Sequence, residues 1–186
     1  EGNYILQLNS KIRIKSEYIT KGINILENNP EIGVVYSDVE FYGEDVSIRK
    51  NDDFNIQHLL VENYLHICAI FRKQVWYDVK GYDEKLNHLF CEDWEFWISA
   101  YKNGWKFYHI PEVLFYYRKK KKSSDPRALE LEKKKEALDY ILFDKHSDLL
   151  YSEFKKNVWQ KTKSTRLESN YFYENQQIIS NLNSQI

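Results

Sequence analysis

Two adjacent acids, Glu92 and Asp93, stand where a predicted helix begins, and a carboxylate in that position could act as a general base. The helix is predicted from an apolar stripe at the spacing i, i+3, i+4 and i+7, which consists of Trp94, Trp97, Ile98 and Tyr101. Asn103-Gly104 supplies the stop, since glycine adopts the left-handed conformation of a helix end without strain. The free N–H groups and positive dipole end of the helix would favour the carboxylate anion and lower its pKa. The same preference makes acids common at helix starts without any function, so the two acids alone leave both interpretations open.

The segments around these acids form an ordered series of motifs. Phe71-Arg72 and Gly81-Tyr82-Asp83-Glu84 precede the helix, whose own motif is Glu92-Asp93-Trp94-Glu95-Phe96-Trp97. Three further motifs follow the helix: Gly104-Trp105, Ile110-Pro111-Glu112-Val113-Leu114-Phe115 and Tyr117-Arg118. This series, in this order and at compact spacing, resembles the C-terminal half of family 2 glycosyltransferases of the GT-A fold. The resemblance extends from about Gly2 to Ser124.

The resemblance implies a fold and a reaction. The fold is α/β: a partial GT-A (Rossmann-like) mixed sheet flanked by helices over residues 1–124, with a C-terminal helical extension over 125–186. The reaction is transfer of a sugar from a nucleotide-sugar donor to a glycan acceptor during assembly of a bacterial cell-surface polysaccharide. The resemblance assigns the base that deprotonates the acceptor hydroxyl to Asp93 first and to Glu92 second. It places Trp94, Tyr82 and Asp83 at the acceptor.

The metal-binding motif of the resembled family is altered in this chain. Family 2 enzymes carry an Asp-x-Asp motif after a strand like the one predicted at Asn3–Leu8, and its carboxylates hold the divalent metal that bridges the donor diphosphate. This chain has Asn9 and Lys11 at the two acidic positions, and a protonated lysine cannot ligate a metal. We therefore expect no metal site and no cofactor. The resemblance makes Asn9, Lys11 and Arg118 the expected donor-binding residues.

Two interpretations of the altered motif remain open. The ammonium group of Lys11 could supply the positive charge of the missing metal and give a metal-independent transferase, or the donor site could be inactive. The second interpretation leads to a rival function, a non-catalytic carbohydrate-binding or protein-interaction module derived from a degenerate glycosyltransferase. In the resembled family, part of the nucleotide-binding region lies before the position of Glu1, so the sequence is also expected to be a fragment or a processed form.

The composition limits the class of protein. The chain has 186 residues, of which 42% are hydrophobic and 16% aromatic, as is typical of a globular domain. Its 27 basic and 28 acidic residues give a net charge of −1, so no overall field recruits nucleic acid. No apolar run is long enough to span a bilayer, and Cys68 and Cys91 are expected to be reduced thiols. The expected location is the cytoplasm, with peripheral association at the inner membrane face as an option and the oligomeric state left open.

Hydrophobic periodicity, together with the glycine, proline and polar residues that interrupt it, predicts the remaining helices, strands and loops. A helix is expected from a cap at Ser16 to about Glu27, and its inward face is expected to consist of Ile19, Ile23 and Leu26. Asp38 is expected at an edge or strand-end position. The predicted strands are Asn3–Leu8, Gly33–Tyr42, Leu65–Phe71, Lys106–His109 and Val113–Arg118. The predicted short helices are Phe54–Asn63 and Lys73–Asp78, Ile110-Pro111-Glu112 is predicted as a turn, and Gly43–Asp53 and Lys85–Cys91 are predicted as loops.

Overall fold

The computed structural model describes residues 2–89, 91–120, 139–161 and 163. The chain divides into two compact units, Glu1–Leu142 and Phe143–Ile186, which are described separately. The boundary expected between residues 124 and 125 lies outside the described residues.

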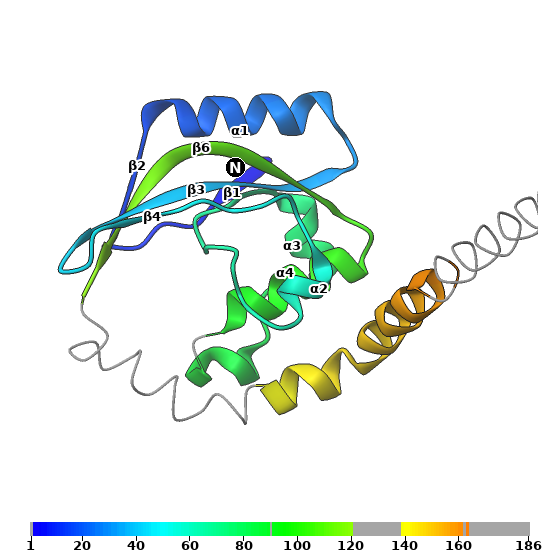
Figure 1. Ribbon diagram of the computed structural model, residues 1–186. Helices are drawn as coiled ribbons and strands as arrows, with labels where there is room; N and C mark the ends of the chain where they lie inside the picture. Colours follow the sequence, from blue (N-terminus) through cyan, green and yellow to red (C-terminus); the bar gives the residue numbers. More distant parts are fainter. Residues whose placement is uncertain (1, 90, 121–138, 162, 164–186) are drawn as a thin grey trace, which may run out of the picture. The chain divides into compact units, whose positions relative to one another are not determined.

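A mixed sheet forms the centre of the first unit (Figure 1). Its strands lie in the order β1-β5-β3-β6-β2, with β4 paired to the far end of β3. Only the pair β3–β6 is parallel within the described sheet. The strands are β1 (Tyr4–Leu6), β2 (Ile12–Ile14), β3 (Ile32–Gly43), β4 (Ser47–Arg49), β5 (Ile70–Arg72) and β6 (Lys106–Lys119). The expected α/β fold with a mixed sheet flanked by helices is confirmed.

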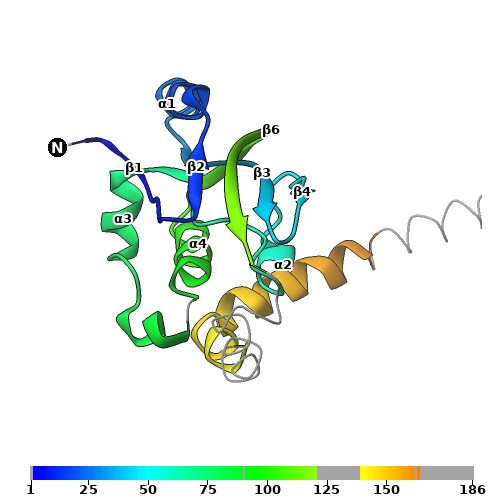
Figure 2. The same cartoon turned by 90° about the vertical axis from the view of Figure 1, so that its left-hand side faces the viewer.

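Helices cover both faces of the sheet. Figures 1 and 2 show α1 on one face and α2, α3 and α4 on the other. Their bounds are α1 (Ser16–Asn28), α2 (Ile56–Leu59), α3 (Lys73–Val79) and α4 (Glu92–Lys102), with a 3₁₀ helix η1 (Glu84–Leu89) before α4. The predicted central helix is therefore confirmed as α4, and Gly104 ends it with a φ of 87°. Of its predicted stripe, Trp94, Trp97 and Ile98 are buried and Tyr101 is half-buried.

Helix α1 differs from its prediction at its start and in its buried face. Lys15 is the N-cap residue, while Ser16 is already helical and its hydroxyl bonds to Glu17. The expected cap at Ser16 is therefore wrong. The buried face consists of Tyr18, Gly22 and Leu26, whereas Ile19 is 42% exposed. Gly22 allows this close approach, because a Cβ there would lie 2.5 Å from Cδ1 of Ile70.

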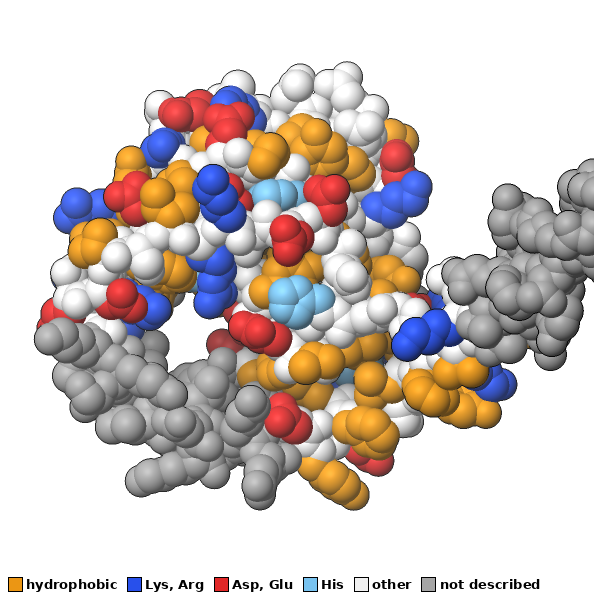
Figure 3. Space-filling view, in the orientation of Figure 1, with side chains coloured by type: hydrophobic (Ala, Val, Ile, Leu, Met, Phe, Trp, Pro, Cys, Tyr) orange, Lys and Arg blue, Asp and Glu red, His pale blue; other side chains and the backbone are white. Residues whose placement is uncertain are grey.

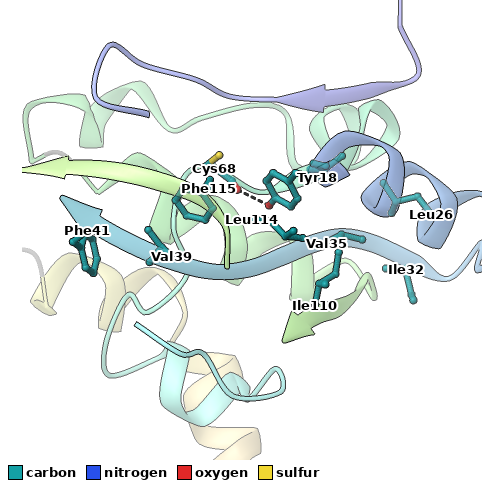
Figure 4. Close-up of a cluster of buried hydrophobic side chains, with 11 residues drawn as sticks. Tyr18, Leu26, Ile32, Val35, Val39, Phe41, Cys68, Ile110, Leu114 and Phe115 are labelled. Atoms are coloured by element: carbon teal, nitrogen blue, oxygen red, sulfur yellow. Dashed lines mark hydrogen bonds between the residues drawn. The ribbon is translucent and has the colours of Figure 1, made fainter. Parts of the chain in front are cut away.

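The core between α1 and the sheet is built around Tyr18 (Figure 4). Its hydroxyl donates a hydrogen bond of 2.7 Å to the carbonyl of Cys68, and its ring stacks on Phe115 at 6.1 Å. Arg72 closes the other end of α1: its Nε donates to the carbonyl of Ile32 at 2.8 Å, and its Nη2 donates to the carbonyls of Leu26 and Asn29. These contacts attach α1 to β5 and β6. Strand β1, which leads to Gln7 and Asn9, pairs with β5.

Three sheet details differ from the sequence-based expectations. Asp38 lies buried within the central strand β3, not at an edge or strand end. The expected turn at Ile110-Pro111-Glu112 is a bulge inside the continuous strand β6, since Ser37 pairs with Ile110 but Asp38 pairs with Val113. A bulge accommodates proline because the ladder needs no N–H there. The expected loop Gly43–Asp53 contains β4.

Two expected elements between residues 65 and 91 also differ. Of the strand expected at Leu65–Phe71, only β5 is paired, although Leu65, Cys68 and Ala69 are buried. The expected loop Lys85–Cys91 contains η1.

The second unit is helical where it is described. Helical residues run over 139–145 and 147–161, the first of these stretches beginning in the first unit. In the described parts of the chain, no helix combines the length and the apolarity needed to cross a membrane.

Figure 3 shows acidic and basic side chains interspersed on the face that it presents.

Candidate functional site

Asp93 lies in the first turn of α4, facing the segment that follows α2. Its Oδ1 accepts the backbone N–H of Trp94 at 2.9 Å and the side-chain amide of Asn63 at 3.4 Å. The helices α2 and α4 are joined beside this contact, because Nε1 of Trp94 donates to the carbonyl of Leu59 at 2.5 Å. Trp94 was expected to border the acceptor. Its side chain is only 7% exposed, and its indole N–H donates to a backbone carbonyl inside the domain.

The pKa of Asp93 is raised from an ordinary value of 3.8 to about 7. Burial of the carboxyl group is the main cause, although the residue as a whole keeps some exposure, and the neighbouring Glu92 adds to the rise. The hydrogen bonds from Trp94 and Asn63 act in the opposite direction. The expected lowering of this pKa at the helix start is therefore wrong, because desolvation and a like charge outweigh the N–H donors.

Glu92 and Asn63 both present buried acceptor atoms. Oε2 of Glu92 and Oδ1 of Asn63 have no hydrogen-bond partner within the part of the chain that the structure describes. Buried acceptors without donors are uncommon in folded proteins. Together with the Asp93 carboxylate they form a small group of acceptors. Glu92 is next to Asp93 in the sequence, and Asn63 contacts Asp93 through a hydrogen bond.

Tyr82 joins this group from the turn after α3. Burial raises the pKa of its hydroxyl, and the charges of Asp93 and Glu92 raise it further, so the ring lies near both acids. Its hydroxyl donates a hydrogen bond to Oε1 of Gln7. Gly81, with a φ of 76°, makes the predicted turn that brings Tyr82 there. Asp83 is turned to the backbone, where its Oδ1 accepts the N–H of Lys85 at 3.0 Å.

The residues expected to bind the donor lie together at the edge of the sheet formed by β2. Oδ1 of Asn9 accepts the N–H of Lys11 at 2.9 Å and so shapes the turn between β1 and β2. The carbonyl of Lys11 accepts the N–H of Arg118 at 2.8 Å, which brings Asn9, Lys11 and Arg118 together. The ammonium group of Lys11 lies over the ring of Tyr117 at 5.8 Å. Across the described residues, no three His, Cys, Asp or Glu side chains are grouped as a metal site.

Gln7 links the two groups and was missed by the sequence analysis. It follows β1 directly, two positions before Asn9, and contacts Tyr82 beside the acids. The only available signal was a polar residue inside the apolar run Asn3–Leu8. Asn63 was missed as well, because nothing local distinguishes it from other polar residues after a short helix.

Comparisons with known proteins found a curated relative and solved structures that are similar to this chain. No family model matches the chain. A protein of Methanocaldococcus jannaschii described as the uncharacterized glycosyltransferase MJ1057 is 30% identical over 129 residues, which cover 63% of this chain and 42% of that protein. The crystal structure of S. aureus TarS residues 1–349 matches with a TM-score of 0.50 and 17% identity, covering 63% of this chain and 36% of that one.

Part of the chain is similar to a protein described as a glycosyltransferase. The curled mixed sheet of this chain, with its flanking helices, is a GT-A-like fold and resembles part of TarS. The chain spans less than half the length of both proteins, so their complete activities do not transfer to it directly.

Proposed function

We propose that this domain is part of a family 2 glycosyltransferase that moves a sugar from a nucleotide-sugar donor to a hydroxyl group of a cell-surface glycan. The single observation that carries the proposal is the Asp93 carboxyl group at the start of α4, with its pKa raised to about 7. A base with a pKa near the working pH combines a useful ionised fraction with enough basicity to accept a proton.

The proposed step is a single displacement. The acceptor oxygen attacks the anomeric carbon, its proton passes to Asp93, and the bond from the anomeric carbon to the nucleoside diphosphate breaks with its electron pair on the leaving oxygen. Glu92 raises the pKa of Asp93 and is the alternative base. Tyr82, Trp94 and Asp83 would border the acceptor.

The proposed contacts to the donor diphosphate come from positively charged side chains. Lys11 and Arg118 are neighbours across β2 and β6, and cationic groups there would stabilise the charge that develops on the departing diphosphate. Asn9 would contribute mainly by shaping the turn that presents Lys11. We place this reaction in the cytoplasm, with association at the inner face of the membrane as an option.

The test measures nucleoside diphosphate release from a panel of UDP-, GDP- and dTDP-sugars by the complete natural protein. Asp93→Asn is expected to fold with a melting temperature no lower than that of the parent and to lower the transfer rate about 10²–10⁴-fold. Glu84→Gln removes an exposed acid from the nearby η1 and is the matched control. Transfer at the parental rate in Asp93→Asn would move the base to Glu92.

The second candidate function is the non-catalytic carbohydrate-binding or interaction module. It is favoured by one observation, the presence of Asn9 and Lys11 where the resembled family carries its metal-binding acids. A parent protein that releases no nucleotide with any donor of the panel would support this module in place of the enzyme.

A further inference from the structure

Asn63 is held in place by the elements on both sides of it. Before it, the carbonyl of Leu59 accepts the indole N–H of Trp94, which fixes α2 against α4. After it, the hydroxyl of the buried Tyr64 accepts the backbone N–H of Asn55 at 2.9 Å, and the Tyr64 ring stacks on His58 at 4.5 Å. The amide of Asn63 therefore has a defined position next to Asp93.

The orientation of the Asn63 amide follows from its neighbour. Its Nδ2 faces Oδ1 of Asp93 at 3.4 Å, and the opposite orientation would place a carbonyl oxygen against a carboxylate oxygen. Oδ1 of Asn63 must then point away from Asp93, and this is the buried atom that lacks a donor within the described residues. One amide thus donates to the proposed base and offers an unused acceptor beside it.

We propose that Asn63 positions Asp93 and binds a second hydroxyl group of the acceptor, adjacent to the reacting one, so that the acceptor is a sugar ring with vicinal hydroxyl groups. This inference rests on the proposed function for the role of Asp93. The reacting hydroxyl donates to Asp93, and its neighbour donates to Oδ1 of Asn63. Oε2 of Glu92 is a further buried acceptor at the same place.

The charges around Asn63 narrow the class of acceptor. Two acids and a carbonyl oxygen attract hydrogen-bond donors and repel phosphate or carboxylate groups. A neutral polyol fits this arrangement, because each of its hydroxyl groups can donate one proton to an acceptor that cannot itself donate. An acidic sugar would place like charge against Glu92 and Asp93.

The first experiment needs no donor or acceptor. Carbon-13 NMR of labelled aspartate follows the titration of Asp93 in the parent, in Asn63→Ala and in the control Asn28→Ala, an exposed asparagine at the end of α1. We expect the pKa of Asp93 to rise in Asn63→Ala, because the anion loses a donor, and to stay unchanged in the control. An unchanged titration in Asn63→Ala would overturn the positioning role, even if the variant is less stable.

The second experiment measures sugar binding by calorimetry. The probes are the methyl glycosides of glucose, galactose and N-acetylglucosamine, followed by the monodeoxy analogues of whichever binds. Loss of the critical hydroxyl should weaken binding about tenfold in the parent and less than about twofold in Asn63→Ala. Equal losses in both proteins, or no binding of any probe, would overturn the vicinal hydroxyl site.

The two proposals fail separately. A parent that binds the glycoside with an Asn63-dependent deoxy effect, yet releases no nucleotide from any donor, contradicts the transferase and retains the sugar site. The parent could instead transfer sugar while the deoxy analogues lose the same affinity in the parent and in Asn63→Ala. This result would support the transferase and would show that Asn63 does not recognise the acceptor.

Discussion

Nε2 of His109 lies 2.8 Å from Oδ1 of Asp38, and both side chains are almost completely buried. The same oxygen of Asp38 accepts the backbone N–H of Asn51 at 2.8 Å, and the imidazole stacks on Tyr36 at 5.1 Å. Asp38 therefore joins β3, β6 and the segment after β4 at the bulge in β6. This acid has a structural role in the sheet.

Asp38→Ala is expected to lower the free energy of unfolding by about 3–5 kcal/mol, because it leaves a buried imidazole and a backbone N–H without their acceptor. Asp38→Asn retains an acceptor oxygen and should cost less. Urea denaturation measures both, together with His109→Ala and the double variant. If the costs of Asp38→Ala and His109→Ala simply add in the double variant, the two side chains are not coupled.

Trp97→Ala is expected to cost about 3–5 kcal/mol of unfolding free energy. Its side chain is fully buried and packs edge-to-face on Phe71 and Phe96, with ring centroids at 5.7 Å and 5.0 Å. Trp97→Phe should cost less, because it also removes a buried indole N–H that has no partner among the described residues. A melting temperature of Trp97→Ala within a degree or two of the parent would contradict the packing of α4.

Local sequence signals predicted the elements that depend on neighbours in the chain. The apolar stripe of α4, the positive φ of Gly81 and Gly104, and the strand at Gly33–Tyr42 all follow from short-range periodicity or glycine stereochemistry. The buried side of α1 could not be predicted in this way, since Tyr18 and Gly22 face the sheet only because β5 and β6 lie there.

The contacts of the candidate site join positions far apart in the chain. Gln7 and Tyr82 are separated by 75 positions, and Asn63 and Asp93 by 30. The resemblance led to the acids, but the raised pKa of Asp93 depends on burial that no local pattern reports. The residues that bring the site together were therefore the ones that the sequence analysis missed.

Asp93 should make the protein less stable as the pH rises. Its pKa in the folded state, about 7, exceeds the ordinary 3.8, so the folded state binds the proton more tightly. This contribution to stability is complete below pH 3.8 and is lost as the pH rises through about 7. Relative to the parent, Asp93→Asn should therefore gain stability steadily from pH 4 to 7 and remain constant above about 7. Urea denaturation across this range checks the slope, and a pH-independent difference would contradict the raised pKa.

The turn between β1 and β2 is expected to bind no Mn²⁺ or Mg²⁺. Asn9 offers one neutral oxygen, which already accepts the N–H of Lys11, and Lys11 offers a cation. Titration calorimetry should show no stoichiometric micromolar binding of either metal. Binding that disappears in Asn9→Ala would show that the altered motif still holds a metal.

Two glycines provide a comparison for testing the packing on the sheet, Gly33 in β3 and Gly22 in α1 against β5. A Cβ at Gly33 would lie 2.8 Å from the Trp105 ring, whose Nε1 is held by Asp78 at 2.9 Å, so Gly33→Ala should cost about 1–3 kcal/mol. Gly22→Ala meets only the flexible end of Ile70, and alanine favours the helix by about 1 kcal/mol. Its cost should therefore be smaller, and thermal unfolding of the two variants gives the order directly.

The parallel pairing of β3 with β6 has a consequence for how the chain reaches its native state. Ile32 pairs with Lys106, so all of β4, α2, β5, α3 and α4 are synthesised between the two halves of the central ladder. The hairpin of β3 and β4 closes a short loop and can form early, whereas the β3–β6 ladder closes a very long one. Chains dominated by such distant pairings fold slowly, typically in milliseconds to seconds. During that interval the backbone edge of β3 stays unpaired and its apolar side chains stay exposed. Substitutions in β6 are therefore expected to change the folding rate as well as the final stability.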